Sequence, residues 1–157
     1  MTFDAVLAGQ LFLSAFLSGV IGLERAWRGK PAGLRTHLLV GMGSTLIMLV
    51  SIHMTTLVPG APVDPSRIAS NVVAGLGFLG AGTIIHSGAD IQGLTTAASL
   101  WATGAIGLAV GCGYYSAAIY AWIGMGIALH GLDRIEKYLV QRAGPRLKAW
   151  LKGLRED

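Results

Sequence analysis

Charged residues are scarce in this chain, and their scarcity excludes most soluble folds. Asp, Glu, Lys and Arg make up 13% of the 157 residues, about half of the usual share in a soluble domain. Apolar residues make up 53% and the mean hydropathy is +0.60. The single cysteine, Cys112, rules out an internal disulfide and a cysteine-cluster metal site. The composition therefore favours one helical membrane domain.

Acidic residues are missing from the middle of every long apolar segment. Outside the C-terminal tail the chain has only Asp4, Glu24, Asp64 and Asp90. Because Mg²⁺ prefers carboxylate ligands, and proton-coupled carriers generally hold an ionisable group within the membrane, the residues alone give either activity weak support. The sequence also lacks a Ser-His-Asp, Cys-His or paired-carboxylate arrangement, so we predict neither an enzyme nor a cofactor or metal site.

Five apolar segments approach the length of about 20 residues that crosses a bilayer as a helix. They cover residues 5–23, 37–58, 68–85, 94–110 and 114–130. Eleven of the 12 Lys and Arg residues lie either between the first two segments or after the fifth, which places both regions in the cytoplasm. We therefore predict an all-α protein of the bacterial inner membrane, a bundle of five transmembrane helices with its N-terminus outside and its C-terminus inside.

The C-terminal tail is predicted to be a basic amphipathic helix in the inner-leaflet interface. Its apolar residues follow helical spacing: Leu147, Trp150, Leu151 and Leu154. A solvated tail or packing on a partner subunit are the alternatives. The chain thus divides into a transmembrane domain, residues 1–131, and a cytoplasmic tail, residues 132–157. The formal net charge of +4 favours anionic lipid headgroups as partners, with no nucleic acid.

Small residues recur at helical spacing in the predicted spans and indicate helix–helix contacts, with a homodimer as the expected assembly. They form the lines Ser14, Ser18 and Gly22; Ala98 and Ala102; Ala105, Ala109 and Gly113; and Gly124 and Ala128.

The segment GLGFLGAG carries glycines in the G-x-G-x-x-G spacing of a dinucleotide site. That motif needs a preceding strand, and here it lies inside an apolar span. We interpret Gly75, Gly77, Gly80 and Gly82 instead as a nearly side-chain-free surface, which a helix, a lipid or an ion path can approach closely. Asn71 adds one of the few polar side chains within a span.

Two predicted cytoplasmic loops hold the remaining polarity. In the first, Glu24 and Arg28 are four residues apart and face each other if the first helix extends this far. Its cations are either ordinary membrane anchors, which the loop alone favours, or a binding site for phosphate or lipid headgroups. In the second loop, Thr95 or Thr96 is a candidate cap for the fourth helix, whose N-terminus is alternatively an anion site.

Three blocks of the sequence resemble the MgtC/SapB family of bacterial inner-membrane proteins. They are GLERAWRGKPAGLRTHLLVGMG, NVVAGLGFLGAGTII and IQGLTTAASLWATGAIGLAVGCGYY, in the family's order and within residues 5–130. The resemblance implies a virulence-associated membrane protein linked to growth at low Mg²⁺. Once regarded as Mg²⁺ transporters, such proteins are now more often viewed as regulators of ATP synthase, of membrane potential or of other transporters.

The resemblance points to two groups of residues and favours a functional role for the first loop. The expected cytoplasmic cluster consists of Glu24, Arg25, Arg28, Arg35, Thr95 and Thr96. The expected packing or pathway surface consists of Asn71, Gly75, Gly77, Phe78, Gly80, Gly82 and Trp101. Two hypotheses follow: a regulator that binds a membrane partner, such as ATP synthase or a cation transporter, and an ion channel or transporter with its path along the glycine-rich helix or a dimer interface.

Overall fold

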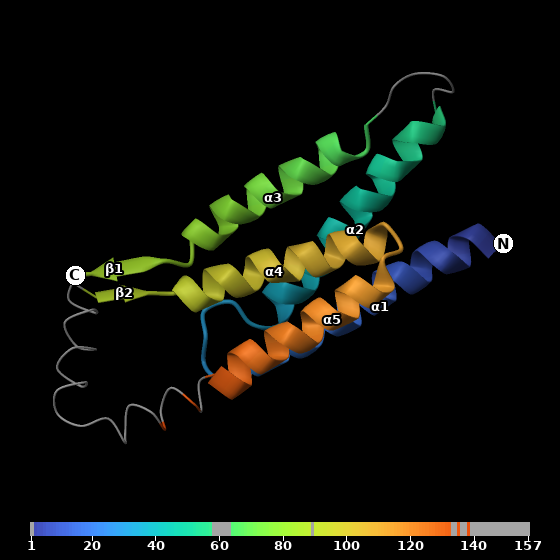
Figure 1. The fold of residues 1–157 in the computed structure, drawn as a ribbon. Coiled ribbons are helices and arrows are strands. Elements are labelled where there is room, and N and C mark those ends of the chain that lie inside the picture. Colours follow the sequence, from blue (N-terminus) through green and yellow to red (C-terminus); the bar gives the residue numbers. More distant parts are fainter. Residues whose placement is uncertain (1, 58–63, 89, 133–134, 136–137, 139–157) are drawn as a thin grey trace.

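The computed structural model describes residues 2–57, 64–88, 90–132, 135 and 138, and this part of the chain is a helical bundle with one short β-hairpin (Figure 1). The helices are α1 (Thr2–Trp27), α2 (Leu34–Leu57), α3 (Ser66–Ala81), α4 (Leu94–Gly111), α5 (Tyr115–Gly126) and the π-helical turn η1 (Ile127–Leu132) that continues α5. The antiparallel strands are β1 (Ile85–Ser87) and β2 (Asp90–Gln92).

Each of the five predicted apolar segments corresponds to a helix. α1 from Asp4 onward, α2 and α4 are long and apolar enough to cross a membrane. α3 has 16 residues and α5 has 12, which is shorter than the roughly 17–25 residues of a spanning helix. The largely helical membrane fold is therefore supported, whereas the five crossings and their orientation stay predictions.

The β-hairpin is a departure from the all-α prediction. The third apolar segment was expected to stay helical to Ile85, but α3 ends at Ala81 and the chain then pairs residues 85–87 with 90–92. Gly93 follows with a φ of 94°, and it, not Thr95 or Thr96, occupies the N-cap position of α4. A Cβ at Gly93 would overlap the carbonyl oxygen of Thr83. Close backbone packing, which requires glycine, thus replaces the predicted side-chain cap.

α1, α2 and α4 contact one another through small residues. A Cβ at Gly41 of α2 would overlap the Ser18 hydroxyl of α1 and lie 3.2 Å from that of Ser14. A Cβ at Gly107 of α4 would overlap the Gly41 carbonyl oxygen, and one at Gly111 would lie 2.7 Å from Met48 Cβ. The first predicted small-residue line, which begins with Ser14 and Ser18, is thus confirmed as a helix–helix contact.

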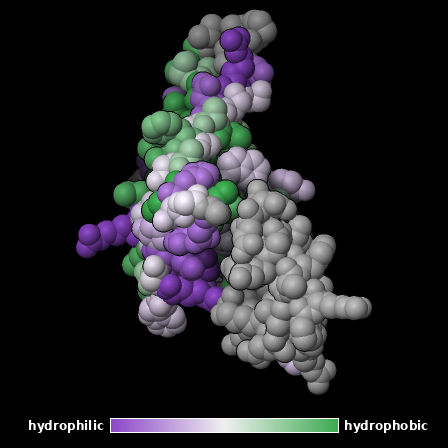
Figure 2. Space-filling model, turned by 90° about the vertical axis from the view of Figure 1, so that its left-hand side faces the viewer, coloured by the Kyte–Doolittle hydropathy of each residue, from purple (hydrophilic) through white to green (hydrophobic). Residues whose placement is uncertain are grey.

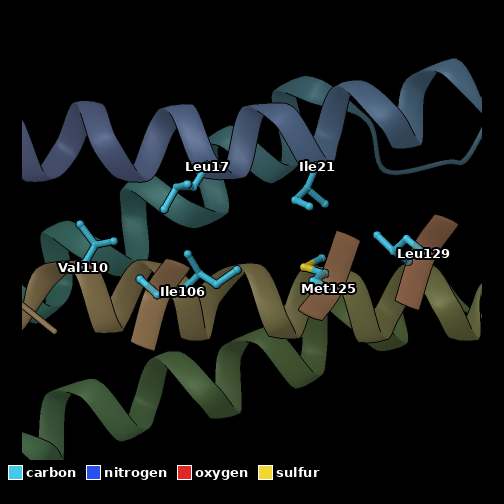
Figure 3. Packing of buried hydrophobic residues seen from close by; sticks show 7 residues of the cluster. Leu17, Ile21, Ile106, Val110, Met125 and Leu129 are labelled. Atoms are coloured by element: carbon cyan, nitrogen blue, oxygen red, sulfur yellow. The ribbon is translucent and has the colours of Figure 1, made fainter. Parts of the chain in front are cut away.

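An apolar cluster joins α5 and η1 to α1 and α4. Figure 3 shows its side chains pointing toward one another from these elements; the cluster consists of Leu17, Ile21, Ile106, Val110, Ala118, Met125 and Leu129. Trp122 Nε1 also donates a hydrogen bond to the Leu17 carbonyl oxygen over 3.0 Å. α5 is therefore held by both dispersion contacts and a partly buried hydrogen bond.

α3 lies on α2 and α4 and is anchored mainly on α4. Leu76 fills the notch at Gly104, because a Cβ there would overlap the Leu76 side chain. One turn further, a Cβ at Gly80 would lie 3.4 Å from Ala97 Cβ. α3 therefore approaches α4 closely along its buried face, Val72, Leu76 and Gly80, and leaves its two flanks open.

The two ends of the bundle differ in polarity. At the end that we call the arginine end, α1 finishes, α2 and α4 begin and the hairpin lies beyond α3 (Figure 1). At the opposite, distal end, Gln10 Nε2 donates hydrogen bonds to the carbonyl oxygens of Val110 and Gly111, over 2.9 and 3.3 Å. These bonds satisfy carbonyl groups that the end of α4 leaves free. In the chain leading into α3, hydrogen bonds from Ser66 lower the pKa of Asp64.

The predicted tight turn between the fourth and fifth segments is present, and Gly113 adopts a φ of 78° in it. The predicted amphipathic helix, with Leu147, Trp150, Leu151 and Leu154, lies outside the described residues.

Candidate functional site

A cluster of ionisable side chains surrounds the Glu24 carboxylate at the arginine end. Its Oε1 lies 2.5 Å from Arg28 Nε, its Oε2 lies 2.5 Å from Arg25 Nε, and Arg25 donates a second bond to Oε1 over 2.8 Å. His130 of η1 brings its Nε2 within 3.9 Å of the same Oε1. The expected pairing of Glu24 with Arg28 is therefore present, because α1 stays helical as far as Trp27.

The charged pair is buried. Arg25 is 2% exposed and Glu24 9% exposed, so each charge has lost most of its hydration. The bidentate contact of a guanidinium with a carboxylate compensates for this loss. Arg28 is partly exposed beside them, and Figure 2, which looks onto this end, shows hydrophilic residues gathered over it. Glu24 and Arg25 thus form a buried ion pair, and the partly exposed Arg28 lies beside it.

The rest of the predicted cytoplasmic cluster lies apart from Glu24. Arg35 is exposed at the start of α2 and forms no hydrogen bond or ion pair with another described residue. Thr95 is exposed and Thr96 is buried in the first turn of α4, and no hydrogen bond within the described chain joins either to Glu24. The structure therefore brings three of the six predicted residues together, and it adds His130 to them.

The sequence analysis missed a buried link between α2 and α4. His37 is fully buried; its Nδ1 lies 3.1 Å from the Gly33 carbonyl oxygen and its Nε2 lies 3.1 Å from Ser99 Oγ. Because a carbonyl oxygen only accepts, Nδ1 carries the ring proton. The Ser99 hydroxyl, which lies near Nε2, also donates to the Thr96 carbonyl oxygen over 2.8 Å. Spacing alone gave no signal for the contact between His37 and Ser99, since the two residues are 62 positions apart.

The four glycines predicted to form one surface on α3 lie in different environments. Gly75 lines a groove between α3 and α2, together with Asn71, which is exposed. Gly77 is two residues further, and thus roughly 200° around the helix from Gly75. Gly80 is buried against α4, and Gly82 lies in the turn after α3. The four glycines share a helix and its end, but not one face.

Two aromatic residues of the predicted surface are exposed. Phe78 of α3 is 81% exposed and Trp101 of α4 is 51% exposed. On α4, Trp101 belongs to a stripe at i, i+3 and i+7 that also contains Ala98 and Ala105, both exposed. No described helix covers this stripe, which we call the open stripe of α4. The predicted role of these residues in function stays a prediction.

Metal-ligating side chains do not gather within the described chain: no group of three or more His, Cys, Asp or Glu residues there is placed to hold an ion. The charged cluster around Glu24 has one carboxylate among three groups that are or can become cationic. Its chemistry therefore suits a phosphate or another anion more than a divalent cation.

A family model and individual relatives both connect the chain to the same protein family. The model of the MgtC family matches residues 11–138. The chain is 52% identical over 114 residues to "Putative magnesium transporter YhiD" of Escherichia coli K12, covering 71% of this chain and 53% of that protein. It is 44% identical over 113 residues to "Protein MgtC" of Salmonella typhimurium LT2, covering 72% and 46%. An uncharacterized protein of Haemophilus influenzae is 33% identical over 146 residues, covering 90% and 61%.

The chain therefore spans about half the length of the first two of these relatives. No solved structure matches it. The family model covers the charged cluster, the groove beside Gly75 and the open stripe of α4. On this evidence, the chain belongs to the MgtC family.

Proposed function

We propose that this protein is a regulator in the bacterial inner membrane, linked to magnesium or energy homeostasis, that acts by binding another membrane protein. The link to magnesium is supported by the description of the YhiD relative as a putative magnesium transporter. The proposed binding surface consists of the open stripe of α4 and the flank of α3 that carries Gly77.

The proposal rests on small residues that are exposed on α4 and α3. Residues of this kind normally lie in contacts between membrane helices. Ala98 and Ala105 are exposed on α4, and a Cβ at Gly77 would have no atom of the described chain within 4 Å. In lipid, helices associate through such small residues because they let the backbones come close. Trp101 supplies an exposed aromatic side chain of the kind that dominates interface energetics. Together these features suit a partner helix.

The proposed topology has five crossings with the arginine end in the cytoplasm. Arg25, Arg28 and Arg35 lie at this end, as the positive-inside rule requires of a cytoplasmic face. α5 has 12 residues and η1, which continues it, has 6. Together they would be about 27 Å long at the rise of an α-helix. α3 contributes 16 residues, about 24 Å, and the turn and hairpin that follow it extend the chain toward the interface.

The alternative is a channel or transporter, and one observation favours it. Polar side chains are buried along the length of the bundle, among them Gln10, Ser14, Thr45, Thr103 and His37. Against this, Gly41 and Gly107 pack so closely that not even a Cβ would fit between them. This contact leaves no room for an ion to pass along the buried polar side chains. Any ion path would then run outside the α1–α2–α4 core, along α3 or between two copies.

Two measurements on the full chain test the proposal. The first is Mg²⁺ and K⁺ flux in proteoliposomes that hold only the purified protein, with Arg28→Ala as a comparison. We expect no flux above that of empty vesicles. Flux that Arg28→Ala reduces would establish a transporter and overturn the proposal.

The second measurement is recovery of membrane proteins with the affinity-tagged chain from native membranes. We expect Gly77→Leu and Ala105→Leu to lower recovery of the main partner about tenfold, because each fills the proposed surface. Gly9→Leu is the matched control, since a Cβ at Gly9 of α1 also has no described atom within 4 Å. Equal recovery by all three variants, at equal insertion and thermal stability, would refute this binding surface.

A further inference from the structure

A groove of about 810 Å³ runs between α2 and α3, on the flank of α3 that carries Gly75. Apolar side chains line most of it, contributed by both helices; they include Leu39, Val40, Ile47, Ile68 and Leu79. Gly43 of α2 and Gly75 of α3 also line the groove, and a Cβ at either position would have no described atom within 4 Å. The two glycines thus keep the groove open and could be filled without disturbing the bundle.

The dimensions of the groove suit an acyl chain. Its lining on α2 extends from Arg35 to Ile47, a separation of twelve positions or about 18 Å along the helix. One leaflet of a bilayer has a hydrocarbon depth of about 15 Å, half of the whole core.

A positive charge stands at one end of this apolar groove. Arg35 and Thr36 line it in the first turn of α2, at the arginine end. Both side chains are exposed, and Arg35 forms no ion pair with another described residue. A guanidinium binds phosphate oxygens through two parallel N–H donors, and a neighbouring hydroxyl can donate a third bond. The charge and the groove together match a molecule with an anionic phosphate on an apolar chain.

We propose that the α2–α3 groove is a binding site for an anionic phospholipid, with its phosphate at Arg35 and an acyl chain along the apolar walls. The site does not depend on the proposed function, because Gly75 lines the groove whereas Gly77 lies on the opposite flank of α3. Bound lipid would join α3, which has few contacts with α2, to the α2 side of the bundle.

Native mass spectrometry of the purified full chain tests the site. The protein is released from detergent after titration with phosphatidylglycerol or with phosphatidylcholine of the same acyl chains, and bound lipids are counted. We expect a roughly fivefold preference for phosphatidylglycerol, the effect of one interfacial cation. Arg35→Gln removes this preference, whereas Lys30→Gln, which also deletes one cation but lies outside the groove, retains it.

A second pair of variants tests the groove itself. Gly75→Leu fills it and is expected to lower retention of both lipids at least fivefold. Gly77→Leu makes the same substitution on the same helix and leaves lipid retention unchanged. If Gly77→Leu lowers partner recovery while Gly75→Leu lowers lipid retention, the lipid site and the proposed regulatory surface are both supported, and failure of either one is visible alone.

Three results would overturn the lipid site. The first is equal retention of both lipids by the unaltered protein and by Arg35→Gln. The second is complete displacement of phosphatidylglycerol by inorganic phosphate, which would identify a phosphate site that needs no acyl chain. The third is a lipid-free dimer that Gly75→Leu converts to monomers, which would place a second copy of the chain in the groove.

Discussion

The α2–α4 interface and the flanks of α3 both contain glycine, but the residue has opposite surroundings in the two regions. At the interface, a Cβ at Gly107 would overlap the Gly41 carbonyl oxygen and lie 2.8 Å from Ser44 Cβ. On α3, a Cβ at Gly75 or Gly77 would have no atom of the described chain within 4 Å. The first region therefore has its packing partner within the chain.

The difference shows what an open glycine means in a membrane helix. Glycine costs conformational entropy in a helix interior, roughly 0.5–1 kcal/mol relative to alanine. At Gly107 the close approach of two backbones offsets this cost. At Gly75 and Gly77 nothing in the described chain does so, which is the reason for placing an external occupant, lipid or protein, on each flank.

Gly107→Ala should produce the largest change in stability, because it adds a side chain to the closely packed α2–α4 interface. The added Cβ must displace the α2 backbone at Gly41, and overpacking of this kind costs about 2–3 kcal/mol. Unfolding of the purified protein in mixed micelles with increasing dodecyl sulfate would measure the loss. Unchanged unfolding would mean that α2 and α4 are further apart than described and would remove the contrast between the two regions.

Ser99→Ala should have an intermediate effect on the same interface. It removes the hydroxyl that lies 3.1 Å from His37 Nε2 and leaves a buried ring nitrogen without a partner, at a cost of about 1–2 kcal/mol. The same unfolding assay measures it. Ser116→Ala provides a control, because Ser116 is exposed on α5. An equal effect of the two substitutions would show that the link between α2 and α4 contributes nothing to stability.

The sequence predicted the helices well because apolar length is a local property. It also predicted the ion pair of Glu24 with Arg28, since a spacing of four residues within one helix determines their approach. The link between His37 and Ser99 was not predictable in this way, because it depends on how α2 and α4 are placed. The β-hairpin was missed for another reason: strands of three residues are too short to show a periodic pattern.

The same limit applies to the candidate sites. Sequence similarity grouped Arg35 with Glu24, but the turn at Pro31 to Gly33 separates the start of α2 from the end of α1, and Arg35 lies at the groove instead. The glycines of α3 were grouped by their spacing, although two residues along a helix already rotate the side-chain position by about 200°. Which of them meets α4 could be learned only from the packing of Leu76 and Gly80 on that helix.

Gly77→Ala should give the smallest change, and its sign is opposite to that of Gly107→Ala. With no described atom within 4 Å of the new Cβ, the substitution causes no clash and removes the entropic cost of glycine, so stability should rise by about 0.5 kcal/mol. The dodecyl sulfate assay on purified protein measures this gain, with Gly43→Ala as a second open position. A loss of stability at Gly77 would mean that the flank is already occupied in the purified protein, for which a second copy of the chain is the natural candidate. A gain at Gly77 beside a loss at Gly107 would establish that the two regions use glycine for different purposes.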